Sequence, residues 1–290
     1  MIERAAGDPD VTAEARRVPT GPCASGTADD ELAFAHDVAD AADKITLARF
    51  GTKDLIVDQK PDLTPVSDAD RATERQIVDM IATARPTHAI VGEEYGATGA
   101  GPWAWIVDPI DGTKNYVRGI PVWATLIALT CNGVPVLGMV SAPALDRRWW
   151  SARKQGAFLN GDQIRVSSVS RVTDAQVSLG AERELAEAGW GEGARAITER
   201  AWRVRGFGDF WSHMLVAEGA ADVALDAGVH AWDMAAVVPI VEEAGGRFSD
   251  FAGRPGYDHG SGLSTNGLVH DEVVALLRGT SRRDRREDVP

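Results

Sequence analysis

The stretch WAWIVDPIDGT (Trp103–Thr113) joins an apolar run to a group of polar residues. Its first part, Trp103–Val107, has the length and composition of a buried strand. Asp108 and Asp111 follow, separated by a Pro-Ile pair. Two carboxylates three residues apart converge if the chain turns between them, and the fixed φ of proline restricts that turn. We therefore expect a polar site at the end of this strand, where α/β proteins usually bind ligands.

This run offers oxygen ligands for a divalent metal. Mg²⁺ prefers carboxylates, carbonyls and water, so Asp108, Asp111 and the carbonyl of Ile110 are candidate ligands. Gly112 lets the backbone approach a ligand closely, and the amides of Gly112 and Thr113 are suited to phosphate oxygens, as at a helix N-terminus. Taken singly, the same acids also fit solubilising or helix-capping roles.

Further acids stand next to other predicted elements. Glu93 and Glu94 follow the apolar run His88–Gly92, and Asp233 stands where a helix is expected to begin. If these strand ends and this helix start meet, their carboxylates form one oxygen-rich site. The combination, more than any single residue, predicts a metal site.

Apolar spacing predicts the remaining elements. Helices are expected at Asp30–Phe50, Asp68–Thr83, Glu182–Ala188, Ala194–Ala201, Phe210–Glu218 and Met234–Ala244. Strands are expected at Thr125–Leu129, Val136–Val140, Val177–Leu179, Ala221–Leu225 and Arg247–Ser249, with more between Trp149 and Ile164. The turn Cys131-Asn132-Gly133 contains an Asn-Gly pair, which indicates a hairpin between the first two.

The organisation along the chain follows from these elements. Residues 1–28 form an N-terminal extension expected to be disordered, and residues 281–290 form a charged tail with the same expectation. Between them we expect an N-terminal α+β half at 29–165, carrying most metal ligands. A C-terminal α/β half at 166–280 would carry Asp233 and substrate contacts. The length of 290 residues suits one large core or two smaller ones.

Composition excludes several classes of partner. The formal net charge of −13 disfavours nucleic acid, although bound cations would still allow a small phosphorylated substrate. Neither a signal sequence nor a run of about 20 apolar residues is present, so no membrane segment is expected. Two cysteines, Cys23 and Cys131, do not suggest a disulfide framework. These features predict a cytoplasmic protein.

Four longer motifs place the acids in a shared context. They are WIVDPIDGTKNYVRGIP (Trp105–Pro121), VGEE (Val91–Glu94), KPDLTPVSDAD (Lys60–Asp70) and HAWDMAAVVPIVEEAGG (His230–Gly246). Through these motifs the chain resembles the inositol monophosphatase superfamily from about Asp30 to Leu277. The resemblance implies a layered α+β or α/β sandwich of alternating α-β-α-β-α layers, with metal ions held between two halves.

The resemblance also implies a role for individual residues. The ligands of two or three Mg²⁺ ions would be Glu93, Asp108, Asp111, Asp233 and the carbonyl of Ile110. Asp68, Thr113 and Glu93 would be catalytic, with Asp68 and Thr113 orienting the attacking water and Asp68 beside the metals or on a third ion. Substrate contacts would come from Asp111, Gly112, Thr113, Asp209, Asp226 and Asp233. Lys60 matches a lysine near the site.

Within the superfamily, Leu126–Arg153 and Trp202–Asp226 are most similar to the histidinol-phosphatase branch used by actinobacteria. This similarity implies a homodimeric, Mg²⁺-dependent phosphomonoesterase that hydrolyses histidinol phosphate in histidine biosynthesis. The alternatives of the same chemistry are inositol monophosphatase, fructose-1,6-bisphosphatase and a 3′-phosphoadenosine nucleotide phosphatase. A non-catalytic metal- or phosphate-binding regulator is the alternative from another class, and the intact acids argue against it.

Two points stay open on the residues alone. Direct attack by water is what the resemblance implies, whereas an aspartyl-phosphate on Asp108 or Asp111 is compatible with the sequence. Histidinol phosphate carries an ammonium group and an imidazole, so its site should add acids away from the metals. The resemblance implies that Asp209 and Asp226 occupy positions where the family contacts the organic part of the substrate, but Asp209 could instead cap the helix that begins near Phe210.

Overall fold

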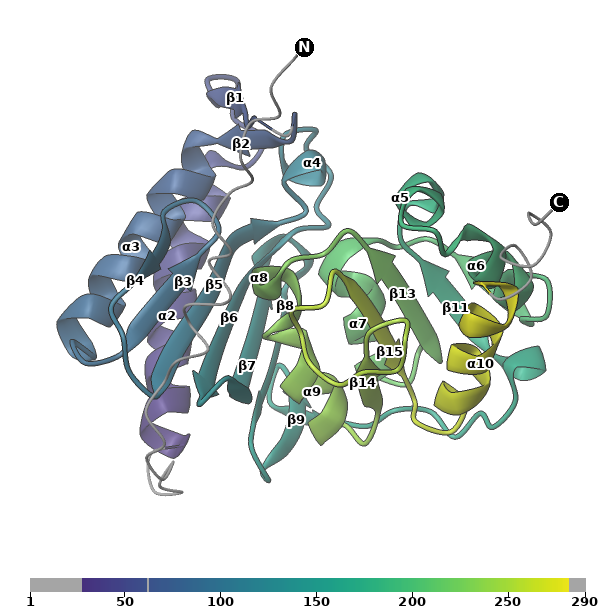
Figure 1. Ribbon diagram of the computed structural model, residues 1–290. Helices are drawn as coiled ribbons and strands as arrows, with labels where there is room; N and C mark the ends of the chain where they lie inside the picture. Colours follow the sequence, from purple (N-terminus) through teal and green to yellow (C-terminus); the bar gives the residue numbers. More distant parts are fainter. Residues whose placement is uncertain (1–27, 62, 282–290) are drawn as a thin grey trace, which may run out of the picture.

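The computed structural model describes residues 28–61 and 63–281, whose main elements form five layers in the order α-β-α-β-α (Figure 1). The outer helices on one side are α2 (Ala28–Arg49) and α3 (Asp68–Ala84). The middle helices are α7 (Asp209–Ala217), α8 (Ala231–Met234) and α9 (Val237–Glu243). The outer helices on the other side are α5 (Glu182–Glu187), α6 (Gly191–Thr198) and α10 (His270–Ser281). The predicted layered fold class is confirmed.

The first sheet has eight strands in the order β10-β9-β8-β7-β6-β5-β3-β4. Their bounds are β3 (Ala89–Gly92), β4 (Gly96–Thr98), β5 (Trp103–Asp111), β6 (Ala124–Cys131), β7 (Val134–Ala142), β8 (Arg147–Ala152), β9 (Gly156–Leu159) and β10 (Asp162–Ile164). The β6–β7 hairpin turns at Asn132 (φ 52°) and Gly133 (φ 76°). Both φ values are positive, as a type I′ turn requires, so the predicted Asn-Gly hairpin is confirmed.

The second sheet has five strands in the order β12-β11-β13-β15-β14. Their bounds are β11 (Gln176–Leu179), β12 (Arg203–Arg205), β13 (Val223–Ala227), β14 (Arg247–Ser249) and β15 (Ser261–Thr265). Smaller elements are the hairpin of β1 (Val57–Gln59) and β2 (Pro65–Ser67), the short helix α4 (Thr113–Tyr116), and the 3₁₀ turns η1 (Pro143–Leu145) and η2 (Val172–Asp174). The sequence patterns indicated neither β12 nor β15.

The main core lies where the middle helices cover the first sheet. Leu126, Trp149 and Ile240 are fully buried there. Helix α9 packs against β7 so closely that a Cβ built on Gly138 would lie 2.2 Å from the carbonyl oxygen of Ala236. A glycine at this position therefore sets the distance between the middle layer and the sheet, and with it the place of the neighbouring helix α8.

Three local predictions differ from the structure. In place of the single helix expected at Met234–Ala244, the structure has two short helices, α8 and α9, with Ala235 and Ala236 between them. Asp108 and Asp111 lie within β5, not beyond its end. Ala28 and Ser281, which the sequence placed in the terminal segments, belong to α2 and α10; the rest of the predicted disordered segments lies outside the described residues.

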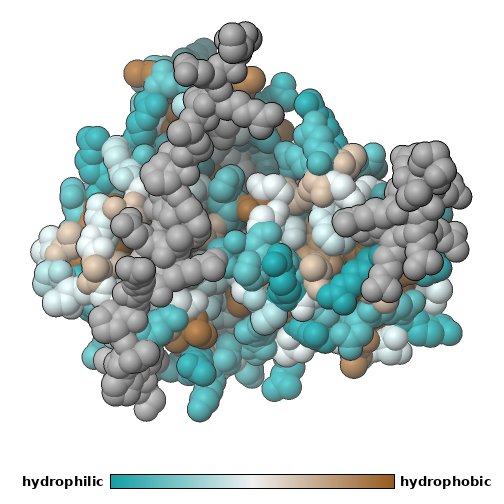
Figure 2. All heavy atoms as spheres, viewed as in Figure 1, coloured by the Kyte–Doolittle hydropathy of each residue, from teal (hydrophilic) through white to brown (hydrophobic). Residues whose placement is uncertain are grey.

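Three further observations concern the surface, the helices and the cysteines. On the face seen in Figure 2, hydrophobic residues stand in small separate groups among polar ones. Among the described helices, none has the length and apolar character needed to cross a membrane. Cys131 is not a free thiol, which differs from the expectation from cysteine content; Cys23 lies outside the described residues.

Candidate active site

A bulge in β5 brings Asp108 and Asp111 to the same side of the sheet. In a regular strand, residues three apart point to opposite faces. Here Asp108 pairs with Leu126 and Asp111 with Ala124, so β5 has one more residue than β6 between these two pairs. The extra residue reverses the alternation. The bulge is stabilised by the Thr125 hydroxyl, which donates to the Pro109 carbonyl at 2.9 Å.

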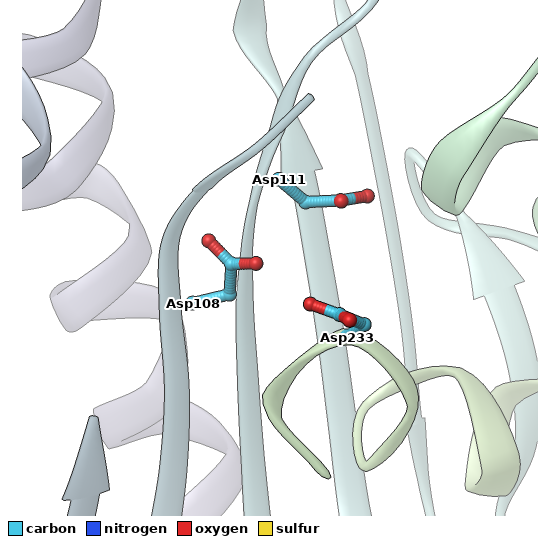
Figure 3. A group of neighbouring side chains, drawn as sticks. All are labelled: Asp108, Asp111 and Asp233. Atoms are coloured by element: carbon cyan, nitrogen blue, oxygen red, sulfur yellow. The ribbon is translucent and has the colours of Figure 1, made fainter. Parts of the chain in front are cut away.

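Helix α8 supplies the third carboxylate. Asp233 accepts a 2.7 Å hydrogen bond from the backbone N–H of His230, which fixes the start of this short helix. Ligand oxygens of Asp108, Asp111 and Asp233 all lie within 4.8 Å of one another. Figure 3 shows the three side chains close together between β5 and α8.

The electrostatics of this cluster favour a bound cation. Burial raises the pKa of Asp108 well above its usual range, and the charges of Glu93 and Asp111 add to the effect. Burial likewise raises the pKa of Asp111, with further contributions from Asp209 and Asp233. A divalent cation would remove this repulsion, and the cluster presents the oxygen ligands that hard cations prefer. The residues present therefore fit a metal such as Mg²⁺.

Glu93 lies beside the cluster but is held by a lysine. Lys60 Nζ is 2.7 Å from Glu93 Oε1 and 2.6 Å from Glu94 Oε1. Burial raises the pKa of Glu93 to about 7, although the hydrogen bond from Lys60 acts in the opposite direction. Lys60 directly follows β1. Its two ion pairs show that the predicted lysine reaches the acids. The predicted ligand Glu93 is thus near Asp108 but forms an ion pair with a side chain of the same protein.

Thr113 is paired with Asp70, not with the predicted Asp68. The Thr113 hydroxyl lies 3.1 Å from Asp70 Oδ1 and 2.9 Å from the Ile110 carbonyl oxygen. Asp68, at the first position of α3, instead forms an ion pair with Arg49, in which Arg49 Nη2 lies 2.8 Å from Asp68 Oδ2. The two aspartates differ because the helix turns by about 200° between them. Asp68 therefore points toward α2, and Asp70 toward the site.

Asp70 is the residue that the sequence reasoning missed. It is fully buried, and its carboxylate also accepts hydrogen bonds from the Ser67 backbone N–H at 2.8 Å and from the Ser67 hydroxyl at 2.5 Å. Burial raises the pKa of Asp70. Ser67 and Asp70 also form a capping box at the start of α3. The signal that could have revealed it is the pair of acids in one motif, Asp68 and Asp70.

The turn after β5 brings Gly112 to the edge of the site. Gly112 has φ 83° and precedes the first residue of α4. A Cβ at this position would lie 2.9 Å from the Val122 carbonyl oxygen and 3.3 Å from Asp209 Oδ2. A side chain is therefore excluded on steric grounds and disfavoured by the positive φ. The predicted phosphate contacts of Gly112 and Thr113 remain predictions.

Asp209 extends the acidic site away from the cluster. It has φ 47° at the start of α7, next to Phe210, whose backbone N–H donates to Asp111 Oδ2 at 2.7 Å. The helix has Gly208 as its N-cap and no side-chain capping hydrogen bond, so the alternative in which Asp209 caps α7 is wrong. Asn115 Nδ2 lies 3.3 Å from Asp209 Oδ2. Burial raises the pKa of Asp209 to about 6, and the charge of Asp226 adds to this.

Asp226 lies near the end of β13 and is 7% exposed. Its charge contributes to the raised pKa of both Asp111 and Asp209, so the three carboxylates share one region. The site thus has two parts. One part is the cluster of Asp108, Asp111 and Asp233, and the other is the pair Asp209 and Asp226.

Comparison with known proteins gives this arrangement a family. The sequence model of the inositol monophosphatase family matches residues 28–281. The histidinol-phosphatase of Mycobacterium tuberculosis is 50% identical over 254 residues, which are 86% of this chain and 98% of the relative. The histidinol-phosphatase of Chlorobaculum parvum is 38% identical over 257 residues, which are 88% and 99% of the two chains.

Solved structures agree with the sequence comparison. The IMPase of Thermotoga maritima has a TM-score of 0.79 and 32% identity, with 87% of this chain and 98% of that chain covered. An inositol monophosphatase from Zymomonas mobilis has a TM-score of 0.78 and 29% identity, with 88% and 100% covered. The chain therefore belongs to the inositol monophosphatase family.

Proposed function

We propose that this chain is a Mg²⁺-dependent phosphatase that hydrolyses histidinol phosphate to histidinol and phosphate. The observation that carries the proposal is the two-part acidic site. The cluster of Asp108, Asp111 and Asp233 suits a cation-bound phosphate, and the pair Asp209 and Asp226 suits a substrate whose organic part is positively charged. The histidinol-phosphatases that are 50% and 38% identical to this chain support the same substrate.

Two or three Mg²⁺ ions would be held by Glu93, Asp108, Asp111, Asp233 and the Ile110 carbonyl. When bound, they would neutralise the phosphate, lower the pKa of a bound water and stabilise the leaving oxygen. Without a cation, the Glu93 carboxylate is paired with Lys60, which only partly offsets the burial that raises its pKa to about 7. Glu93 would exchange this partner for a metal ion when the site fills.

The protein groups then orient the water and the ester. Asp70, through its contact with the Thr113 hydroxyl, would accept a proton from the attacking water. The water oxygen forms the new bond to phosphorus as the bond to the ester oxygen breaks. The released alkoxide takes up a proton from solvent water, and Asp70 returns to solvent the proton that it accepted. The amides of Gly112 and Thr113 would hold the phosphate oxygens. Asp68 is not required for this step, because Arg49 occupies its carboxylate.

The proposal is tested by initial rates with phosphate detection at saturating Mg²⁺. Histidinol phosphate is expected to give a kcat/KM at least about tenfold above that of inositol 1-phosphate, since recognition of a charged group is worth more than that of a hydroxyl. Fructose 1,6-bisphosphate and a 3′-phosphoadenosine nucleotide complete the panel. A higher kcat/KM on any of the other three substrates would contradict the substrate assignment.

Asp209→Asn separates substrate recognition from phosphate chemistry. The variant is expected to lose activity on histidinol phosphate while keeping that on glycerol 2-phosphate, because only the first substrate has a cationic group to pair with Asp209. Asparagine tolerates the positive φ at this position. Equal losses on both substrates would remove Asp209 from the recognition role.

We also propose a cytoplasmic homodimer whose partners are small phosphorylated substrates and not nucleic acid. The net charge of −13 supports the last point, because it repels a phosphate backbone. The dimer is what the family resemblance implies. Light scattering on the purified protein is expected to give twice the chain mass of 30.9 kDa, and a mass of one chain would contradict it.

A further inference from the structure

A buried histidine stands behind Asp226. His213 lies on α7, one helical turn after Asp209, and is fully buried. Its Nδ1 is 2.7 Å from the hydroxyl oxygen of Ser264, and its Nε2 is 3.7 Å from Asp226 Oδ2. The ring is therefore placed between a serine of β15 and an acid of the proposed substrate site.

The register of the second sheet explains this placement. Ala224 and Asp226 are two residues apart on β13, so both face the same side of the sheet. Ser264 pairs directly with Ala224 in the antiparallel β13–β15 ladder and shares that side. Helix α7 packs on β13 and β15. One side chain of α7 can thus contact Ser264 and Asp226 together, and His213 occupies that position.

The hydrogen-bonding groups define which nitrogen of His213 carries a proton. If Nδ1 donated to Ser264 in a neutral ring, the lone pair of Nε2 would face a carboxylate oxygen in a buried position, which is repulsive. If the Ser264 hydroxyl donates to Nδ1, Nε2 carries the proton and directs an N–H at Asp226. A doubly protonated ring would direct the same N–H. The arrangement therefore favours an Nε2–H group facing the acid.

The contact with His213 is the one that can orient the Asp226 carboxylate. Oδ2 of Asp226 and Nε2 of His213 are both buried, and within the described part of the chain neither has a hydrogen-bond partner. On the other side of the carboxylate, a Cβ built on Gly180 would lie 1.9 Å from Oδ1. Gly180 thus makes room for the carboxylate, and His213 is the polar group placed to fix its orientation.

We propose that His213 is a positioning residue, which holds Oδ2 of Asp226 and leaves Oδ1 to pair with the cationic group of the substrate. The inference rests on the proposed function, because it assumes a substrate with an ammonium or imidazolium group. Ser264 selects the tautomer of His213 in this arrangement. Helix α7 then carries one acid of the pair, Asp209, and the group that orients the other, Asp226.

The test compares His213→Leu and His213→Gln on histidinol phosphate and on glycerol 2-phosphate. Leucine removes the N–H, whereas the glutamine amide can restore a donor near the position of Nε2. The leucine variant is expected to raise KM for histidinol phosphate about tenfold, with kcat within about twofold and glycerol 2-phosphate unaffected. The glutamine variant is expected to recover most of the loss. Ser264→Ala serves as a second route if the leucine variant does not fold.

A matched control comes from the opposite face of the same strand. His270 is also fully buried, and its Nδ1 is 3.0 Å from the hydroxyl of Thr265, the neighbour of Ser264. His270→Leu is expected to lower the melting temperature without changing the ratio of kcat/KM between the two substrates. If His213→Leu lowers activity on both substrates equally, or on neither, the positioning role is overturned.

A spectroscopic measurement separates this inference from the proposed function. In protein with ¹⁵N-labelled histidine, the His213 ring is expected to give a protonated Nε2 whose shift changes in Asp226→Asn. A deprotonated Nε2, or a signal that Asp226→Asn leaves unchanged, would overturn the inference whatever the substrate is. If the NMR result holds but wild-type protein does not prefer histidinol phosphate, the proposed function fails and the contact stands.

Discussion

Asp68 and Asp70 stand two positions apart in one motif and have different environments. Asp68 is half-buried and paired with Arg49, while Asp70 is buried and contacts Thr113. The family resemblance gave the role beside Thr113 to Asp68, whereas in the structure Asp70 makes the contact with Thr113. The assignment depends on the rotation of α3 about its axis, and the packing of α3 against α2 sets that rotation, which spacing within the motif does not reveal.

Asp70→Asn is predicted to lower kcat on histidinol phosphate by about a hundredfold or more, because the proton acceptor for the water is lost. Mg²⁺ affinity should change little, since Asp70 is not among the clustered carboxylates. Asp68→Asn is the matched comparison and should cost much less, because it changes only the partly buried ion pair with Arg49. Steady-state rates and calorimetric Mg²⁺ titration measure both effects. A larger kcat loss in Asp68→Asn than in Asp70→Asn would support Asp68, and not Asp70, as the residue that acts on the attacking water.

The raised pKa of Glu93 predicts how metal binding depends on pH. A carboxylate must lose its proton to bind a cation, so protons compete with Mg²⁺ below the pKa of about 7. Mg²⁺ affinity is expected to rise between pH 5.5 and 7 and to level off above pH 7.5. Calorimetric titration across this range gives the profile. An affinity independent of pH would mean that Glu93 does not bind the metal.

At the scale of elements, the bulge in β5 decides the geometry of the site. Sequence patterns located the strand and the two aspartates, but they ended the strand at Val107. The bulge forms because β6 pairs with both sides of the Pro-Ile insertion, with Leu126 opposite Asp108 and Ala124 opposite Asp111. Such a register is a property of two strands together, so the run Asp108–Asp111 alone could not reveal it.

Gly138→Ala tests how the middle helices are held on the first sheet. The added Cβ would meet the carbonyl oxygen of Ala236 at 2.2 Å, so α9 and the nearby α8 must shift. We expect a loss of unfolding free energy of at least about 2 kcal/mol and weaker Mg²⁺ binding, because α8 carries Asp233. Urea denaturation measures the first effect.

The control for this substitution is Gly279→Ala in α10, where a Cβ would meet nothing within 4 Å. Alanine is the better helix former, so this variant should gain up to about 1 kcal/mol. A Gly138→Ala protein as stable as the wild type would show that the close approach of α9 to β7 does not set the position of the middle layer.

For the whole molecule, local patterns predicted most helices and the β6–β7 hairpin, and the family resemblance implied the layered class. They did not indicate β12 and β15, which are a three-residue edge strand and a Gly- and Ser-containing strand with weak apolar alternation. Because β15 pairs with β13, missing it also concealed the contact between Ser264 and His213. The cluster of Asp108, Asp111 and Asp233 was predictable from motifs, whereas the packing behind Asp226 depends on tertiary contacts.

Crowded acids should also make folding stability depend on pH. The pKa of Asp209 is raised to about 6 in the folded protein, so the native state binds more protons than the unfolded state between about pH 4 and 6. This contribution to stability is present at low pH and is lost as pH rises through 6. Buried histidines such as His270, with a pKa lowered to about 4, act in the opposite direction.

The difference between wild type and Asp209→Asn isolates this effect, since both proteins share the histidines. Without Mg²⁺, the melting temperature of the wild type relative to the variant is predicted to fall between pH 4.5 and 7. Differential scanning calorimetry at constant ionic strength provides the comparison. A relative melting temperature that rises over this interval would mean that Asp209 ionises normally in the folded state.

Removal and return of the metal test the central claim most directly. Protein stripped with a chelator is assayed for phosphate release from histidinol phosphate, then titrated with Mg²⁺, in parallel with Asp233→Asn. We predict loss of activity on stripping, full recovery with Mg²⁺ in the wild type, and at most weak recovery in the variant, because Asp233 completes the three-carboxylate cluster. Undiminished hydrolysis by the stripped protein, or full recovery in Asp233→Asn, would contradict the account.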